Sequence, residues 1–156
     1  MVLYFNNYAF TKLQRMEKVI IGRIDRADFP KLGLSDIDIK IDTGAYTSSI
    51  HCNHIREEDN ILCCTFLDPK HPEYNDKEMR FSDYDITAVK SSNGEIQYRY
   101  VVQSNITIFQ KTFKISLTLS SREDMRFPVL IGRKFLTKKF IVDTELTDVS
   151  HSQKVL

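Results

Sequence analysis

The sequence predicts an all-β protein, folded as a closed β-barrel with one short C-terminal helix. Its apolar segments are short and rich in β-branched residues, which favours strands. The Ser-Ser-Asn-Gly segment at residues 91–94 indicates a β-hairpin, and only residues 133–139 are typical of a helix. Many short strands followed by a single late helix indicate a closed or nearly closed barrel.

The first half of the chain contains three predicted strands. Residues 18–24 form a β-branched run, and residues 36–41 alternate strictly between charged side chains and isoleucine. Because side chains alternate across a strand, these isoleucines are expected to face the core. Residues 61–67 form a third apolar run, and the polar, proline-containing segment 68–80 is expected to be a loop.

The second half of the chain begins with the hairpin. Residues 84–90 and 95–102 are its predicted strands, and the Asn-Gly pair between them tolerates positive φ angles. In the next predicted strand, residues 112–119, apolar side chains again alternate with polar ones. The remaining predicted elements are a strand at 127–131, the helix at 133–139 and a strand at 140–142.

Length and composition indicate a single domain. A chain of 156 residues is long enough to bury one sizeable core. We expect this domain at residues 18–145, with an N-terminal extension at 1–17 and a C-terminal tail at 146–156. The formal net charge of +1 gives the protein no general attraction to nucleic acid or to an anionic membrane.

Hydropathy and cysteine content bear on the cellular compartment. No apolar run approaches the roughly 20 residues that span a bilayer, and the first residues do not resemble a signal peptide. The cysteines are odd in number, and Cys63 and Cys64 are adjacent, an arrangement that rarely forms a disulfide. We therefore expect free thiols in a reducing compartment and a cytoplasmic protein.

The predicted strand at 36–41 leads directly into Asp42-Thr43-Gly44-Ala45. Gly44 permits backbone geometry that a Cβ would prevent, and the Thr43 hydroxyl can hydrogen-bond to a neighbouring loop. A carboxylate at the end of a rigid strand is well placed for acid–base chemistry, so Asp42 is the candidate catalytic residue. The alternative is an ordinary turn between strands, for which Asp, Thr and Gly are common.

A second motif supports the catalytic interpretation. The apolar run Val129-Leu130-Ile131 is followed by Gly132 and the predicted helix. An apolar strand ending in Asp-Thr-Gly-Ala, together with a later apolar run and glycine before a helix, resembles the retropepsin-like aspartic peptidases. The resemblance implies the acid-protease barrel and a catalytic role for Asp42, with Thr43 and Gly44 forming the rest of its motif.

The similarity is closest to a bacterial family that is labelled ATP-dependent zinc protease and is associated with ligases that add glutamate to a ribosomal protein. It extends from about residue 18 to residue 143, and its departures, Tyr46 and Ile50, do not touch the proposed chemistry. The matching positions are 41–45, 47–48, 50–51, 92–94, 99–101, Arg122, Met125, 127–133, 135–136 and 142–143.

This resemblance implies a homodimer. Aspartic peptidases use two carboxylates that share one proton, and the chain has a single Asp-Thr-Gly. The similar segment at Asp143 has Glu145 where glycine is required, so we expect Asp143 to be structural. The second catalytic Asp42 must then come from another copy of the chain. Ala45 cannot donate a side-chain hydrogen bond to the carboxylate, which predicts activity near neutral pH.

The associated ligases imply that the substrate is a peptide rich in glutamate. Arg99, Arg122 and Arg133 lie near the matched motifs and are candidate substrate-binding residues together with Ala45. The alternative for Arg133, at the start of the predicted helix, is that it ties loops together. A flap over the substrate is also expected, and both the 84–102 hairpin and the loop at 68–80 are candidates for it.

Two other functions remain open at this point. A zinc protease would need clustered ligands, but there is no His-Glu-x-x-His helix and no Cys-x-x-Cys pair, so no metal and no cofactor are predicted. The chain has no Gly-x-x-x-x-Gly-Lys-Ser/Thr loop for ATP either. The other alternative is a dimeric peptide-binding module on the same fold that does not cleave its ligand.

Overall fold

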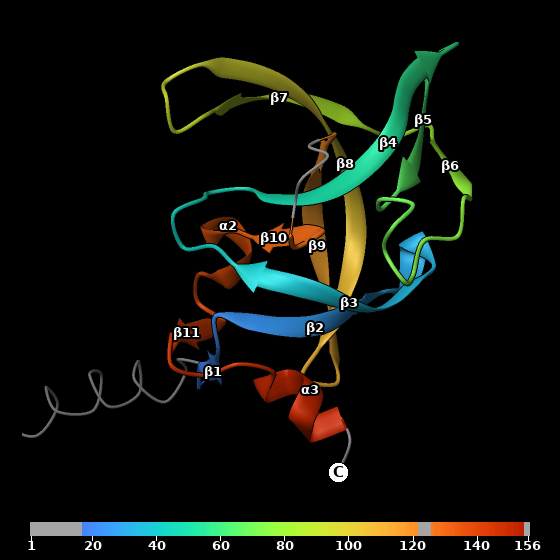
Figure 1. Cartoon of the computed structure of the whole chain (residues 1–156). Helices are drawn as coiled ribbons and strands as arrows, with labels where there is room; N and C mark the ends of the chain where they lie inside the picture. Colours follow the sequence, from blue (N-terminus) through green and yellow to red (C-terminus); the bar gives the residue numbers. More distant parts are fainter. Residues whose placement is uncertain (1–16, 122–125, 155–156) are drawn as a thin grey trace, which may run out of the picture.

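The computed structural model describes residues 17–121 and 126–154. The predicted N-terminal extension therefore lies outside the described residues, apart from Glu17. Figure 1 shows a β-barrel with a long hairpin projecting from one end and short helices at its periphery. Within the described residues, no helix has the length and apolar composition needed to cross a membrane.

Six strands close the barrel, which confirms the predicted fold class. They follow the order β10-β3-β2-β8-β9-β4, and β4 pairs with β10 to complete the circle. The strands are β2 (Ile24–Phe29), β3 (Leu34–Ile41), β4 (Ser48–Glu58), β8 (Ile96–Ile108), β9 (Lys111–Ser120) and β10 (Val129–Ile131).

The buried side chains lie on the strand faces that the sequence predicts. In β3, the three isoleucines at 37, 39 and 41 are buried, and Asp38 and Lys40 between them are exposed. In β9, Ile115, Leu117 and Leu119 face the core. Several polar side chains in β4 and β9 are buried too, because these strands pack on both faces.

The predicted hairpin is formed by β7 (Asp85–Lys90) and the first half of β8. Its turn has three residues between Ser91 and Glu95, which differs from a two-residue Asn-Gly turn. Gly94 N–H donates to the Ser91 carbonyl at 3.0 Å, and Gly94 alone of the Asn-Gly pair has positive φ, +88°. This is a type I turn followed by a glycine bulge, which preserves the strand pairing.

The predicted strand at 18–24 is divided into two. β1 (Val19–Ile21) leaves the barrel to pair in parallel with β11 (Phe140–Val142), and β2 begins at Ile24. The break falls at Gly22, where an added Cβ would lie 2.2 Å from the Leu146 carbonyl oxygen. The remaining strands, β5 (Ile61–Phe66) and β6 (Glu78–Phe81), extend the sheet beyond β4.

Three short helices complete the described part of the chain. They are η1 (Pro30–Leu32), α2 (Arg133–Leu136) and α3 (Val149–Lys154). α2 is the helix that the sequence predicts at 133–139, although it ends at Leu136, and α3 lies in the segment expected to be a C-terminal tail. The buried carboxylate of Asp25 in β2 accepts hydrogen bonds from Ser150 N–H at 2.8 Å and His151 N–H at 3.0 Å. Asp25 thus caps the N-terminus of α3 from a different element and holds it on the barrel.

Candidate active site

Asp42 is the first residue after β3, which ends at Ile41. β3 pairs in parallel with β10, and the pairing continues one residue further because Asp42 N–H donates to the Ile131 carbonyl at 2.9 Å. β10 ends at this point and Gly132 leads into α2. The two motifs singled out in the sequence are therefore neighbours in space.

The Asp42 loop is compact and faces outward. Gly44 N–H donates to Oδ1 of Asp42 at 3.2 Å, and Ala45 N–H donates to the Asp42 carbonyl at 3.2 Å. The Asp42 and Ala45 side chains are half-buried, whereas Thr43 and Gly44 are exposed. The backbone thus fixes the carboxylate at a surface that another chain can reach.

The segment after β10 supports the Asp42 loop from behind. Gly132 N–H donates to the buried Oγ of Ser48 at 3.0 Å. Arg133 donates twice to the loop, from its backbone N–H to the Ala45 carbonyl and from Nη1 to the Thr43 carbonyl, both at 2.9 Å. The loop is consequently held by groups from two distant parts of the chain.

Replacing Gly132 with alanine is expected to lower the free energy of unfolding by about 2 kcal/mol. An added Cβ would lie 2.5 Å from the Thr47 carbonyl oxygen and 2.7 Å from that of Tyr46, both of them backbone atoms with little room to move. Chemical denaturation measures the change. Gly44→Ala is the matched control, since its Cβ would meet only the Asp42 side chain, at 3.3 Å. Equal losses in the two variants would contradict this account.

A cavity of about 540 Å³ lies in front of the Asp42 carboxylate. The tip of the β7–β8 hairpin forms its opposite wall through Lys90, Ser91 and Ser92. Figure 1 shows this tip and the loop after β3 on the same side of the molecule. Of the two flap candidates, the hairpin is therefore the one that covers the candidate site. The lining residues are Asp42, Gly44, Ala45, Thr47, Ser49, Val89, Lys90, Ser91, Ser92, Arg99 and Leu130.

The candidate substrate-binding residues have different positions. Ala45 and Arg99 line the Asp42 cavity. The Arg133 guanidinium contacts the Thr43 carbonyl and lies 5.9 Å from the centre of the Tyr46 ring, so it ties the loop to α2. Arg122 lies outside the described residues.

The cysteines and histidines that a zinc site would need do not form a metal-binding group. In the described part of the chain, no three His, Cys, Asp or Glu side chains are grouped so that they could hold a metal ion. Cys52, Cys63 and Cys64 are fully buried. The pKa of the Cys52 thiol is raised above its ordinary value, mainly by a hydrogen bond with Cys64 and secondly by burial. These thiols pack as small apolar groups in the core.

Sequence reasoning did not single out several residues of this site. Thr47 and Ser49 line the cavity, and Ser48 between them accepts the hydrogen bond from Gly132. Thr47 and Ser48 match the family pattern but were given no role from the sequence, and the only sequence signal of Ser49 is its position soon after the Asp-Thr-Gly-Ala motif. Lys90 belongs to the hairpin, and its place in the cavity depends on how that hairpin folds over the barrel.

A six-stranded barrel with an Asp-Thr-Gly-Ala loop held by Arg133, which follows β10 and Gly132, defines the retropepsin-like aspartic peptidase class. A model of one family within it, described as "RimB-like: Retropepsin-like aspartic endopeptidase RimB", matches residues 20–153. The chain belongs to this RimB-like family.

Curated relatives carry a different name. A "Probable alpha-L-glutamate ligase" of Shewanella halifaxensis is 36% identical over 132 residues, which are 81% of this chain and 28% of the relative. A protein of the same name from Desulfotalea psychrophila is 32% identical over 139 residues, 85% of this chain and 30% of the relative. The chain thus spans less than a third of these relatives.

A solved structure shares the fold over most of the chain. The crystal structure of a protein of unknown function from Legionella pneumophila superimposes with a TM-score of 0.67 and 26% sequence identity. The match covers 86% of this chain and 99% of the Legionella chain.

Proposed function

We propose that the protein is an aspartic endopeptidase that acts as a homodimer, with Asp42 of each copy supplying one of two catalytic carboxylates. One observation carries this proposal. Among the described residues that line the cavity, Asp42 is the only carboxylate, and it lies on a loop with exposed neighbours. The mechanism needs two carboxylates, so a second copy has to supply the other.

The chain offers no internal replacement among its described residues. Asp143 follows β11, outside the barrel, and its Oδ1 accepts a hydrogen bond from Glu145 N–H at 3.0 Å, as in an Asx turn. In the proposed dimer, the same Asp42 loop of both copies meets at a two-fold axis. The two hairpins then close over the cleft from the two sides.

The proposed chemistry uses one shared proton. Two carboxylates a few ångströms apart do not both ionise readily, so one is ionised and the other protonated. The ionised carboxylate takes a proton from water while the water oxygen attacks the peptide carbonyl carbon. The protonated carboxyl group donates to the carbonyl oxygen. When the tetrahedral intermediate collapses, the C–N bond breaks and the first carboxyl group gives the proton it took from water to the leaving nitrogen. The second carboxylate regains its proton from the hydroxyl group that becomes the new carbonyl.

Glutamate-rich peptides are the proposed substrates. Two observations support this choice. The curated relatives, in which the matched segment is 28% and 30% of the length, are named "Probable alpha-L-glutamate ligase". The cavity in front of Asp42 also carries the cations Lys90 and Arg99. Cations beside the cleft favour a peptide with acidic side chains.

Cleavage of a glutamate-rich peptide by the wild-type protein is expected to continue unchanged in EDTA, because the proposed mechanism uses carboxylates and water alone. Mass spectrometry of the fragments measures the rate and locates the cleaved bond. Loss of cleavage with the chelator, and recovery with added zinc, would support the zinc protease instead. Tight peptide binding without any cleavage would support the binding module.

A further inference from the structure

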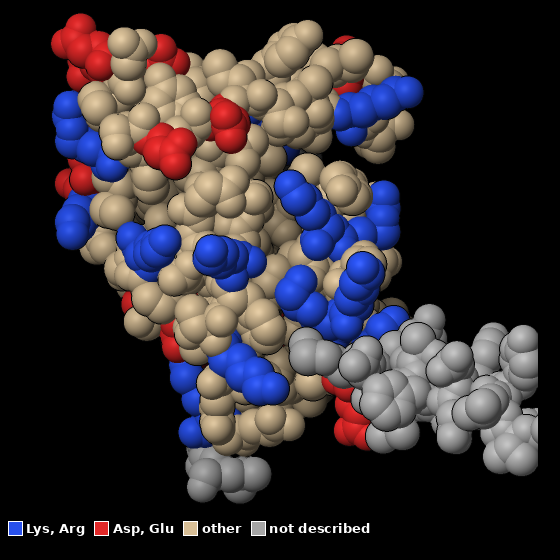
Figure 2. All heavy atoms as spheres, turned by 180° about the vertical axis from the view of Figure 1, so that it is seen from behind, with Lys and Arg blue, Asp and Glu red and all other residues tan. Residues whose placement is uncertain are grey.

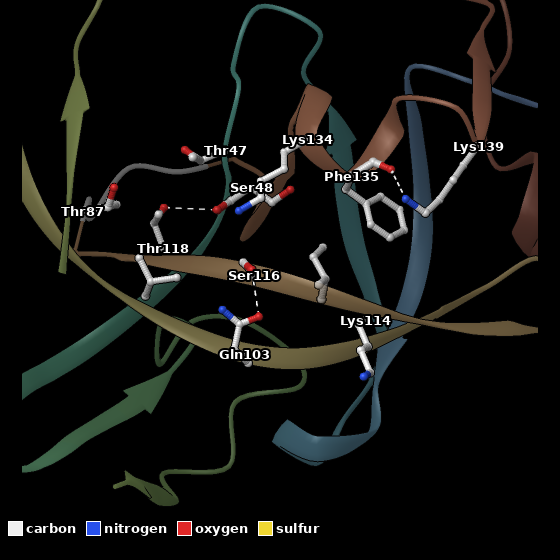
Figure 3. Close-up of a pocket in the computed structure, with 12 residues that line it drawn as sticks. Thr47, Ser48, Thr87, Gln103, Lys114, Ser116, Thr118, Lys134, Phe135 and Lys139 are labelled. Carbon is white, nitrogen blue, oxygen red and sulfur yellow. Dashed lines mark hydrogen bonds between the residues drawn. The ribbon is translucent and has the colours of Figure 1, made fainter. Parts of the chain in front are cut away.

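A second cavity, of about 190 Å³, lies beside the Asp42 cleft. Figure 3 shows that β7, β8, β9, α2 and the segment after the Asp42 loop contribute its walls. Its volume is below that of typical small-molecule sites and is suited to one amino-acid side chain. It is lined by Thr47, Ser48, Thr87, Val101, Gln103, Lys114, Ile115, Ser116, Thr118, Lys134, Phe135 and Lys139.

The charge of this cavity is uniformly positive. Three lysines line it, Lys114 from β9, Lys134 from α2 and Lys139 from the segment after α2, and none of its lining residues is acidic. In residues 17–121 and 126–154, no carboxylate forms an ion pair with any of the three. Lysines that line one cavity without acidic partners favour binding of an anion.

This positive charge is local. The chain as a whole has a formal net charge of only +1. Figure 2 nevertheless shows Lys and Arg side chains gathered across the middle of one face, with Asp and Glu mostly above and below. A protein of nearly balanced charge that concentrates its cations in this way attracts anions to one region.

Gln103, Lys139 and Phe135 complete a site for a carboxylate on a short chain of methylene groups. The Ser116 hydroxyl donates to Oε1 of Gln103 at 2.8 Å, which leaves the Gln103 amide N–H groups as donors. Lys139 Nζ donates to the Phe135 carbonyl at 2.9 Å and lies 5.0 Å from the centre of its ring, so its position is fixed (Figure 3). The Phe135 side chain supplies an apolar wall for methylene groups.

The cavity is connected with the candidate active site through two elements. Thr47, five residues after Asp42, lines both cavities. The hairpin contributes Val89 and Lys90 to the Asp42 cleft and Thr87 and Val101, nearer its base, to the lysine cavity. The two cavities are therefore neighbours, and one peptide beneath the hairpin can contact both.

We propose that this lysine cavity is a specificity subsite that binds a carboxylate of the substrate, a glutamate side chain or the C-terminal carboxylate, to one side of the cleaved bond. The proposal rests on the proposed peptidase function and assigns its acidic selectivity to Lys114 and Lys134, with Lys139 and Gln103 completing the site. The residues that recognise the substrate carboxylate are thus separate from the catalytic Asp42.

The first test measures binding without cleavage. A fluorescent glutamate-rich peptide is titrated into the Asp42→Asn protein by anisotropy, with and without the double substitution Lys114→Gln and Lys134→Gln. We expect the double substitution to weaken binding about tenfold. The control carries Lys31→Gln and Lys77→Gln, which remove the same charge from exposed positions outside both cavities, and it is expected to bind as before. Thermal unfolding of each variant shows that it is folded.

The peptide series identifies the bound carboxylate. Each glutamate is replaced in turn by glutamine, and a further peptide is amidated at its C-terminus. If a peptide with one glutamate replaced binds equally to the proteins with and without the lysine substitutions, the side chain of that glutamate occupies the cavity. If only the amidated peptide binds equally to both, the C-terminal carboxylate occupies it. Either result supports the subsite. The subsite would be overturned if the lysine substitutions weakened binding of every peptide equally or weakened none. It would also be overturned if a phosphoserine peptide bound more tightly than the glutamate peptide.

Peptide cleavage by proteins that retain Asp42 separates the two proposals. If the wild-type protein cleaves, the lysine variant should raise KM for the acidic peptide about tenfold and leave kcat nearly unchanged. If the wild-type protein cleaves nothing but the binding result holds, the subsite stands and the peptidase proposal fails. If it cleaves and the lysine substitutions change neither binding nor KM, the peptidase stands and the subsite fails.

Discussion

The Asp42→Asn protein is expected to lose peptidase activity about a thousandfold or more. Asparagine has nearly the shape of aspartate, so it can keep the hydrogen bond from Gly44 N–H at the Asp42 side chain. It has no carboxylate to accept a proton from water, however, and no acidic proton to share across the dimer. Single-turnover cleavage of a glutamate-rich peptide measures the effect.

Asp143→Asn is the matched control for this substitution. Asp143 also precedes a threonine, but its Oδ1 only accepts the turn hydrogen bond from Glu145 N–H, which an asparagine oxygen can accept as well. We expect full activity and unchanged stability. Residual activity above a few per cent in the Asp42 variant, or an equal loss in the Asp143 variant, would show that the catalytic group is elsewhere.

Asp25→Ala is expected to destabilise the fold by about 3 kcal/mol, the largest effect on stability that we predict. The Asp25 side chain is 1% exposed, and its carboxylate accepts hydrogen bonds from Arg26 N–H at 2.8 Å and from two N–H groups at the start of α3. Alanine would leave these donors without acceptors inside the protein. The free energy of unfolding from urea denaturation measures the loss.

Asp38→Ala is the control for the stability prediction. Asp38 lies on the neighbouring strand β3 and forms an ion pair with Arg26 at 3.5 Å, but its side chain is 54% exposed. An exposed pair of this kind contributes less than about 1 kcal/mol. If both substitutions cost the same, the helix-capping role of Asp25 would be wrong.

The parts of the fold that could be predicted depend on local sequence patterns. The alternation at residues 36–41 predicted β3 and its buried face, and Gly94 in the Asn-Gly pair predicted the hairpin that covers the site. β6 was not predicted, because its first three residues lie in the segment 68–80 that was expected to be a loop, and neither was the strand β4. Its first five residues, including Ser48 and His51, are all buried, because neighbours on both sides remove the alternation that would have revealed it.

The same distinction applies to the candidate site. Asp42 and Gly132 could be found because short motifs surround them. The lysine cavity could not, since Lys114, Lys134 and Lys139 come from different elements that only the barrel brings together. Arg133 had two possible roles in the sequence, and only the structure shows that it contacts the Thr43 carbonyl. The capping of α3 by Asp25 joins residues 125 positions apart and has no local signature.

Subunit mixing tests most directly whether one catalytic site contains Asp42 of two copies. Wild-type and Asp42→Asn chains are refolded together at a series of ratios and total cleavage is measured at constant protein concentration. If both carboxylates are needed, activity falls with the square of the wild-type fraction, to about a quarter in an equal mixture. A linear fall, with half of the activity remaining in that mixture, would contradict the shared site.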